Sequence, residues 1–185
     1  MWGIIVVLIL ILALAFYVIA LYNGLVVARK RAEVSWNDID VQLKKRYDLL
    51  PDLVETAKKA THLDESIFTK VTELRSRAMS TSPTDTQAKA QLETQLSAAV
   101  HGLQVAVEAY PDIKSHTELI TLMNLNRDIE DKIAYSRQFY NQNVLDYNTR
   151  IEVFPAVLFA GALGFKSMEA FEASVEEKQD VKVSF

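Results

Sequence analysis

The sequence predicts an all-α protein, in which an N-terminal transmembrane helix is followed by an elongated antiparallel helical bundle with long helices. Two observations carry this prediction: an uncharged apolar run near the N-terminus, and hydrophobic side chains that recur at helical spacing through most of the remaining chain. A third is the scarcity of glycine, since Gly102 is the only glycine between residues 25 and 160. Hairpins, phosphate-binding loops and most active-site turns use glycine, so β-strands have almost no support.

Residues 2–22, WGIIVVLILILALAFYVIALY, carry no charged side chain. As a helix they extend roughly 32 Å, the thickness of a bilayer core, and we expect a retained transmembrane anchor. The alternative is a cleaved signal peptide, but no Lys or Arg precedes the run and the run is too long for one. Basic residues follow at 29–31 and 44–46. The positive-inside rule therefore predicts a single-pass protein of the cell (inner) membrane, with the N-terminus outside and the helical domain in the cytoplasm.

The bundle domain is expected over residues 23–152, with helices at about 24–60, 64–79, 83–109 and 111–152. In the first helix an apolar stripe through Trp36, Leu43 and Leu50 keeps its phase across Pro51. We therefore prefer a kinked helix to a new helix that starts at the proline. Asp64 is the expected N-cap of the second helix, because its side chain can accept from the first free backbone N–H groups.

The third helix carries an apolar seam in alternating steps of four and three, the heptad spacing of a coiled coil: Leu92, Leu96, Ala99, Leu103, Ala106 and Tyr110. This seam can fill the protein's own bundle or join neighbouring protomers. The fourth helix should end before Pro155, since the residue ahead of a proline avoids the helical conformation. An apolar segment, 153–173, and a charged tail, 174–185, follow it. Its most apolar part, residues 154–165, has twelve residues and is too short to span a bilayer as a helix, but it can pack on the bundle, lie in the membrane surface or join subunits.

The composition argues against several classes of function. The net charge of −4 and the pI of about 5.4 give no basic surplus for nucleic acid, and the absence of cysteine excludes disulfides and thiol chemistry. The histidines lack metal-ligand spacing, and the sequence contains no P-loop or nucleophile-elbow motif. We therefore predict a non-enzymatic protein with no catalytic, cofactor-binding or metal-binding residues.

Four polar residues lie on the apolar faces of the predicted helices: Asp40 and Arg46 on the first helix, Arg137 and Asn141 on the fourth. They can mark the exposed flank of a narrow stripe. They can also form a buried ionic network that fixes the register of the helices. In the second case they must be paired, because a lone buried charge is very costly.

Three motifs are distinctive: a Trp-x-x-Ile-Asp-x-Gln-Leu-x-x-Arg run that leads to a proline, ExxI…RxxYNxxVxxYN at 130–148, and FPAVLFAGALGFKSMEAFEA at 154–173. With them the chain closely resembles the LemA family over essentially its whole length apart from residues 63–109. The signature positions, which we expect to be structural or interaction residues, are Trp36, Asp40, Gln42, Arg46, Pro51, Glu130, Arg137, Tyr140, Asn141, Tyr147, Asn148, Pro155, Gly164 and Phe165.

The resemblance implies a helical domain on a membrane anchor and brings no established catalytic activity or cofactor. Family members are often encoded near membrane metalloproteases of the HtpX type, and a relative takes part in magnetosome membrane formation. We expect a scaffold or adaptor that contacts the lipid bilayer, forms a homo-oligomer through its long helices and organises membrane or envelope proteins. The alternative is a regulator or substrate adaptor of a membrane quality-control protease of that type.

Overall fold

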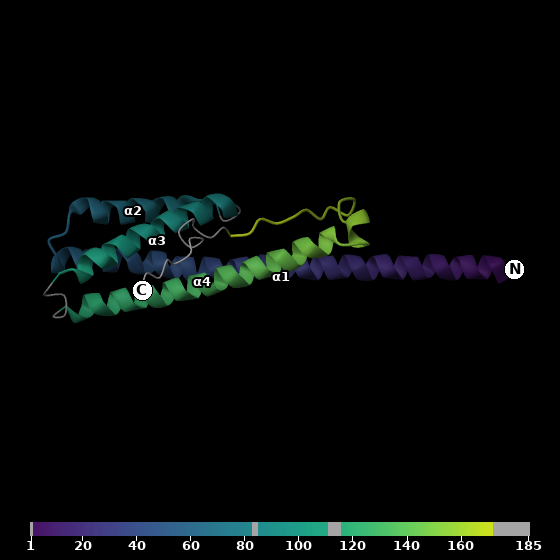
Figure 1. The fold of residues 1–185 in the computed structure, drawn as a ribbon, viewed down its shortest axis with the longest axis horizontal. Coiled ribbons are helices and arrows are strands. Elements are labelled where there is room, and N and C mark those ends of the chain that lie inside the picture. Colours follow the sequence, from purple (N-terminus) through teal and green to yellow (C-terminus); the bar gives the residue numbers. More distant parts are fainter. Residues whose placement is uncertain (1, 83–84, 111–115, 172–185) are drawn as a thin grey trace, which may run out of the picture. The chain divides into compact units, whose positions relative to one another are not determined.

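The computed structural model describes residues 2–82, 85–110 and 116–171 (Figure 1). Every element in these ranges is helical: α1 (Trp2–Ala60), α2 (Glu65–Ser80), α3 (Thr86–Glu108), α4 (Thr117–Glu152) and the short 3-10 helix η2 (Ala156–Leu158). The predicted all-α class, with a long apolar N-terminal helix and a helical bundle, is thereby confirmed. The predicted tail at 174–185, and the prolines at 83 and 111 where two helices were expected to start, lie outside the described residues.

Helix α1 joins the predicted anchor and the first predicted bundle helix without a break. It continues through Pro51, so the alternative of a new helix starting at that proline is wrong, while the bend there stays a prediction. Within the part of the chain that the structure describes, α1 is the one helix that is long and apolar enough to cross a membrane. Nearly all side chains from Trp2 to Ala20 are exposed, as lipid-facing side chains would be.

The described residues form two compact units, and each takes in part of α1 and part of α4. The anchor unit contains α1 up to Asn37 together with Gln138–Ala170. The bundle unit contains Asp38–Arg137 together with Phe171.

In the anchor unit, α1 and α4 run antiparallel, because Trp36 contacts Tyr140 whereas Leu25 shares a core with Ile151. The apolar segment that follows α4 folds back onto this helix pair. The buried residues of this core are Leu25, Ala28, Tyr147, Ile151, Ala156, Ala160 and Phe165. The C-terminal segment therefore belongs to the folded anchor unit.

In the bundle unit, side-chain caps start two helices. The Ser66 N–H donates to Oδ1 of Asp64 at 2.7 Å, which confirms the predicted N-cap of α2, and the Ala88 N–H donates to Asp85 at 3.0 Å at the start of α3. Each cap satisfies a backbone donor that the first turn leaves free.

The apolar seam of α3 lies inside the bundle unit. Leu96, Ala99 and Leu103 are buried within the chain, but Leu92 is only half-buried. The buried line runs instead through Glu93, Leu96, Val100, Leu103 and Val107. Because Leu96 and Leu103 are already covered by the chain itself, they are not available to a neighbouring protomer.

Candidate functional site

A buried polar cluster, centred on Arg46 of α1, lies in the core of the bundle unit. The Arg46 side chain has no exposed surface. Its Nη1 donates to the Ser97 hydroxyl at 3.0 Å and lies 3.4 Å from Oε2 of Glu93, both on α3. Its Nη2 lies 3.4 Å from Oε1 of Glu130 on α4. One guanidinium therefore connects three helices, and two carboxylates compensate its charge.

Glu93 is the fully buried carboxyl group of this cluster, and the Tyr47 hydroxyl donates a hydrogen bond to its Oε1. Burial raises the pKa of Glu93 above its usual range, although the charge of Arg46 opposes the rise. Burial also raises the pKa of Tyr47, and the nearby Glu93 adds to this effect. Tyr47 therefore remains a neutral donor to the Glu93 carboxyl group.

A second ion pair joins Asp40 of α1 to Lys89, which lies one turn before Glu93 on α3. The Lys89 side chain is almost fully buried, whereas Asp40 is half-exposed. Arg137 stacks with its guanidinium carbon 4.3 Å from the centre of the Phe171 ring. The structure thus contains a buried ionic network, in which Arg46 pairs with Glu93 and Asp40 pairs with Lys89.

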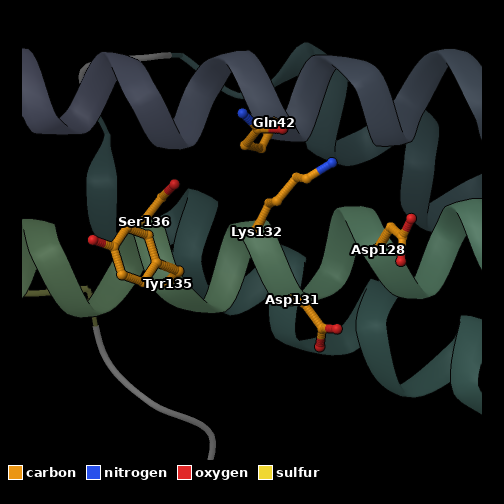
Figure 2. Close-up of a pocket in the computed structure, with 6 residues that line it drawn as sticks. All are labelled: Gln42, Asp128, Asp131, Lys132, Tyr135 and Ser136. Atoms are coloured by element: carbon orange, nitrogen blue, oxygen red, sulfur yellow. The ribbon is translucent and has the colours of Figure 1, made fainter.

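An open hollow of ≈ 520 Å³ lies between α1 and α4 of the bundle unit and contains the signature residue Gln42 (Figure 2). Its lining residues are Gln42, Asp128, Asp131, Lys132, Tyr135 and Ser136. Figure 2 shows Lys132 reaching from α4 toward α1, while Asp131 points away from it. General acid–base catalysis requires two groups that converge on one point, and the carboxylates of Asp128 and Asp131 do not. Among the described residues no group of three or more His, Cys, Asp or Glu side chains could hold a metal ion.

Two signature tyrosines on α4 hold the C-terminal segment in the anchor unit. The hydroxyls of Tyr140 and Tyr147 donate to the backbone carbonyls of Glu169 and Lys166, each at 2.8 Å. Tyr140 also packs edge to face on Trp36, with the ring centres 5.3 Å apart. The two tyrosines, seven residues apart on α4, therefore both hold the C-terminal segment, and Tyr140 also packs on α1.

Asn148 binds the same segment at both ends of its side-chain amide. Its Nδ2 donates to the Met168 carbonyl at 2.8 Å, and the Met168 N–H donates to its Oδ1 at 2.9 Å. The segment turns at Gly164, whose φ of 80° lies in the left-handed region that favours glycine. Phe165 is then buried against Tyr22, edge to face, with 5.5 Å between the ring centres. The tyrosines and Asn148 together form what we call the α4 clasp: Tyr140, Tyr147 and Asn148.

The other signature residues are positioned as follows. The Phe154–Pro155 peptide bond is cis and lies between α4 and η2. Asn141 lies half-buried on α4 in the anchor unit. Pro51 is exposed on α1 in the bundle unit, where it lines a shallow groove with Arg75.

Sequence reasoning missed the α3 half of the buried cluster: Lys89, Glu93 and Ser97. A signal was present, because steps of four and three back from Val107 pass through Leu103, Val100 and Leu96 to Glu93 and Lys89. Centring the seam on these residues would have placed two charges on the buried face of α3.

Residues 35–185 match the family model of the LemA family. The chain is 25% identical over 174 residues to the magnetosome protein MamQ of Magnetospirillum gryphiswaldense, an alignment that covers 81% of this chain and 64% of the relative. It is 24% identical over 141 residues to the protein LemA of Metamycoplasma hominis, covering 76% of this chain and 64% of the relative. The chain thus spans a little under two thirds of these relatives' lengths. With the exposed apolar half of α1, these matches indicate a membrane-associated helical protein, and the chain belongs to the LemA family.

Proposed function

We propose that this protein is a non-enzymatic, membrane-anchored scaffold that associates with further copies of itself and organises membrane or envelope proteins. The observation that carries the proposal is a groove of ≈ 690 Å³ on the surface of the anchor unit, between α1 and α4. Apolar side chains contribute much of its lining, and three of them, Val27, Val34 and Phe139, are at least half exposed. A groove of this kind on an anchored helix pair is suited to receive another helix.

The spacing of the apolar side chains fits a second copy of the same chain. Val27 and Val34 lie seven residues apart on α1 and are 50% and 58% exposed, and Phe139 of α4 is 50% exposed beside them. A seven-residue apolar repeat is the seam along which two helices pack. Copies anchored in one membrane present this seam at the same height and in the same direction, so a symmetric contact between two copies can form.

Two further observations support a scaffold. The buried cluster around Arg46 connects three helices inside the bundle unit. The charged residues of the neighbouring hollow do not converge on a reaction centre. Both features serve a rigid helical body rather than a chemical step.

The orientation that we propose keeps the N-terminus outside and the helical domain in the cytoplasm. Arg29, Lys30 and Arg31 are exposed directly after the anchor and support this orientation. Because the chain has no cysteine, Ser76→Cys on the exposed face of α2 gives a single labelling site. A membrane-impermeant maleimide should label this variant only in opened cells. Labelling of intact cells would reverse the proposed orientation.

The mass of the full-length protein in mild detergent tests self-association. We expect an oligomer that Val34→Glu converts to a monomer, because the substitution places a charge in the groove. Val105→Glu is the matched control, since Val105 is 53% exposed on α3 and does not line the groove. A wild-type protein that remains monomeric at high concentration would contradict self-association.

The alternative function is regulation of a membrane metalloprotease of the HtpX type, or delivery of substrates to it. It would use the same anchor, and the groove would then take a helix of the protease. Photo-crosslinking from position 34 in native membranes separates the two functions. Products made of two copies of this chain favour the scaffold, and a dominant protease adduct favours the alternative.

A further inference from the structure

Residues 153–163 of the anchor unit have an inverted distribution of apolar side chains, with small ones buried and large ones exposed. Its small residues Ala156 and Ala160 are buried, whereas Phe154 is 78% exposed and Leu158 is 65% exposed. The other large apolar side chains that remain exposed in this segment are Val153, Val157 and Leu163. A folded segment in water normally turns its largest apolar side chains inward. These five residues are therefore an apolar patch that the fold holds outward, and we call it the 153–163 patch.

The patch lies where the predicted membrane span ends. Phe165, two residues after the patch, packs on Tyr22, the last residue of the span. Leu21 packs against the core that contains Ala156 and Ala160. Figure 1 shows this segment, in yellow-green, folded against α1 part-way along the helix, so that the N-terminal part of α1 extends beyond it. The patch is thus fixed at the level where the acyl chains of a bilayer meet the head groups.

Basic residues of the anchor unit follow Tyr22 along α1, on the head-group side of this level. Arg29 is about 10 Å beyond Tyr22 along α1 at helical rise. Arg29, Lys30 and Arg31 are exposed there, and Glu33 pairs with the first two, so the group keeps a positive surplus. Apolar side chains toward the acyl region and cations toward the head groups are the pattern of an interfacial membrane-binding segment.

We propose that the 153–163 patch inserts into the bilayer interface beside the α1 anchor, as a second membrane contact in the same leaflet. The segment is too short to cross the bilayer, so its large side chains enter only the outer acyl region. A lone anchor can tilt and rotate, whereas two contact points fix which face of the anchor unit lies along the membrane. The proposal depends on the membrane anchor, but it does not depend on self-association.

Depth-dependent fluorescence quenching in the full-length protein tests this insertion. The natural chain has no cysteine, so Leu158→Cys offers one site for an environment-sensitive nitrobenzoxadiazole probe. Because Leu158 is exposed, we expect the substitution to leave the fold intact. The protein is reconstituted in phosphatidylcholine–phosphatidylglycerol vesicles that carry spin labels at a shallow or a deep acyl position. We expect several-fold stronger quenching of the probe by the shallow label.

Probes at two control sites show what deep insertion and no insertion look like in the same measurement. A probe at Ala15→Cys, inside the span, should be quenched best by the deep label. A probe at Ser76→Cys, on the exposed face of α2, should be quenched by neither label. If the Leu158→Cys probe behaves like the Ser76→Cys probe while the Ala15→Cys probe is quenched, the insertion is wrong. A Leu158→Cys chain that forms disulfide-linked dimers on oxidation and escapes lipid quenching would overturn it too, because a second copy then covers the patch. Failed self-association in the mass measurement leaves the expected quenching unchanged.

Discussion

Arg75 of α2 donates a hydrogen bond from its Nε to the backbone carbonyl of Tyr47 on α1, at 2.6 Å. This carbonyl is the one that the N–H of residue 51 would bond in a regular helix, and Pro51 has no N–H. Arg75 therefore supplies the donor that the proline removes. Because a buried carbonyl without a partner is costly, this contact explains how α1 continues through Pro51.

The contact predicts that Arg75 and Pro51 are energetically coupled. Arg75→Met should lower the free energy of unfolding by about 1–2 kcal/mol in the natural chain, since one charged hydrogen bond is lost. After Pro51→Ala the alanine N–H can donate to the Tyr47 carbonyl. In that background Arg75→Met should therefore lower the free energy of unfolding clearly less than in the natural chain. Urea unfolding of the four variants in mild detergent measures the difference. Arg77→Met, at an exposed position on α2, is the control, and equal costs of Arg75→Met in both backgrounds would refute the coupling.

The buried cluster predicts a strongly asymmetric result for Arg46 and Glu93. Arg46→Met alone should destabilise the protein by about 3–5 kcal/mol, because it leaves the Glu93 carboxyl buried without its cation. Replacing both residues by Met should recover most of this loss, since apolar side chains of similar volume then fill the core. Arg127→Met breaks a half-exposed pair with Glu108 and should cost at most about 1 kcal/mol. Additive losses for Arg46 and Glu93 would show that the two side chains act independently.

Glu93 also predicts a pH dependence of stability. Because burial raises the pKa of Glu93 in the folded protein, the folded chain holds the carboxyl proton more tightly than the unfolded chain, in which a glutamate has a pKa of about 4.3. The resulting stabilisation is complete below that pH and is lost as the pH rises through the folded pKa. Glu93→Gln keeps an acceptor for the Tyr47 hydroxyl but cannot ionise. The free energy of unfolding of the natural chain, minus that of Glu93→Gln, should therefore fall as the pH rises from about 4.

The control for this pH profile is Glu73→Gln, at an exposed glutamate of α2. The free energy of unfolding of the natural chain, minus that of Glu73→Gln, should not change over the same pH range. A difference profile for Glu93→Gln that rises with pH would mean that Arg46 outweighs burial and holds the folded pKa of Glu93 below its unfolded value.

The helical architecture could be predicted because it depends on short-range periodicity, which a sequence displays directly. The position of Arg46 on an apolar face was also visible, but its partner was not. Glu93 lies 47 residues further along the chain, and no local pattern links two residues at that distance. Only the packing of α3 against α1 brings them together.

The C-terminal segment could not be predicted for a different reason. Most of it is not regular helix, so periodicity does not indicate which of its side chains face inward. The exposure of Phe154 and the burial of Ala156 follow from how the segment folds back on α1 and is held by the α4 clasp. A family resemblance marks such residues but does not show what they touch.

The turn that leads into the clasp predicts different outcomes for two glycines three residues apart. Gly164→Ala should destabilise the segment by about 1 kcal/mol or more, because a side chain disfavours a φ of 80°. Gly161→Ala should be nearly neutral, since its φ is not positive, and at both glycines an added Cβ would meet nothing within 4 Å. Any difference between the two variants is thus conformational rather than steric.

Hydrogen exchange of the Met168 amide reports this effect, because its N–H is held by Asn148 when the segment is docked. We expect Gly164→Ala to speed its exchange about fivefold or more, which corresponds to the 1 kcal/mol above. Gly161→Ala should leave the rate close to that of the natural chain. Equal protection in both variants would mean that the clasp holds residues 166–169 independently of the turn at Gly164, so that the turn is a consequence of docking and not one of its causes.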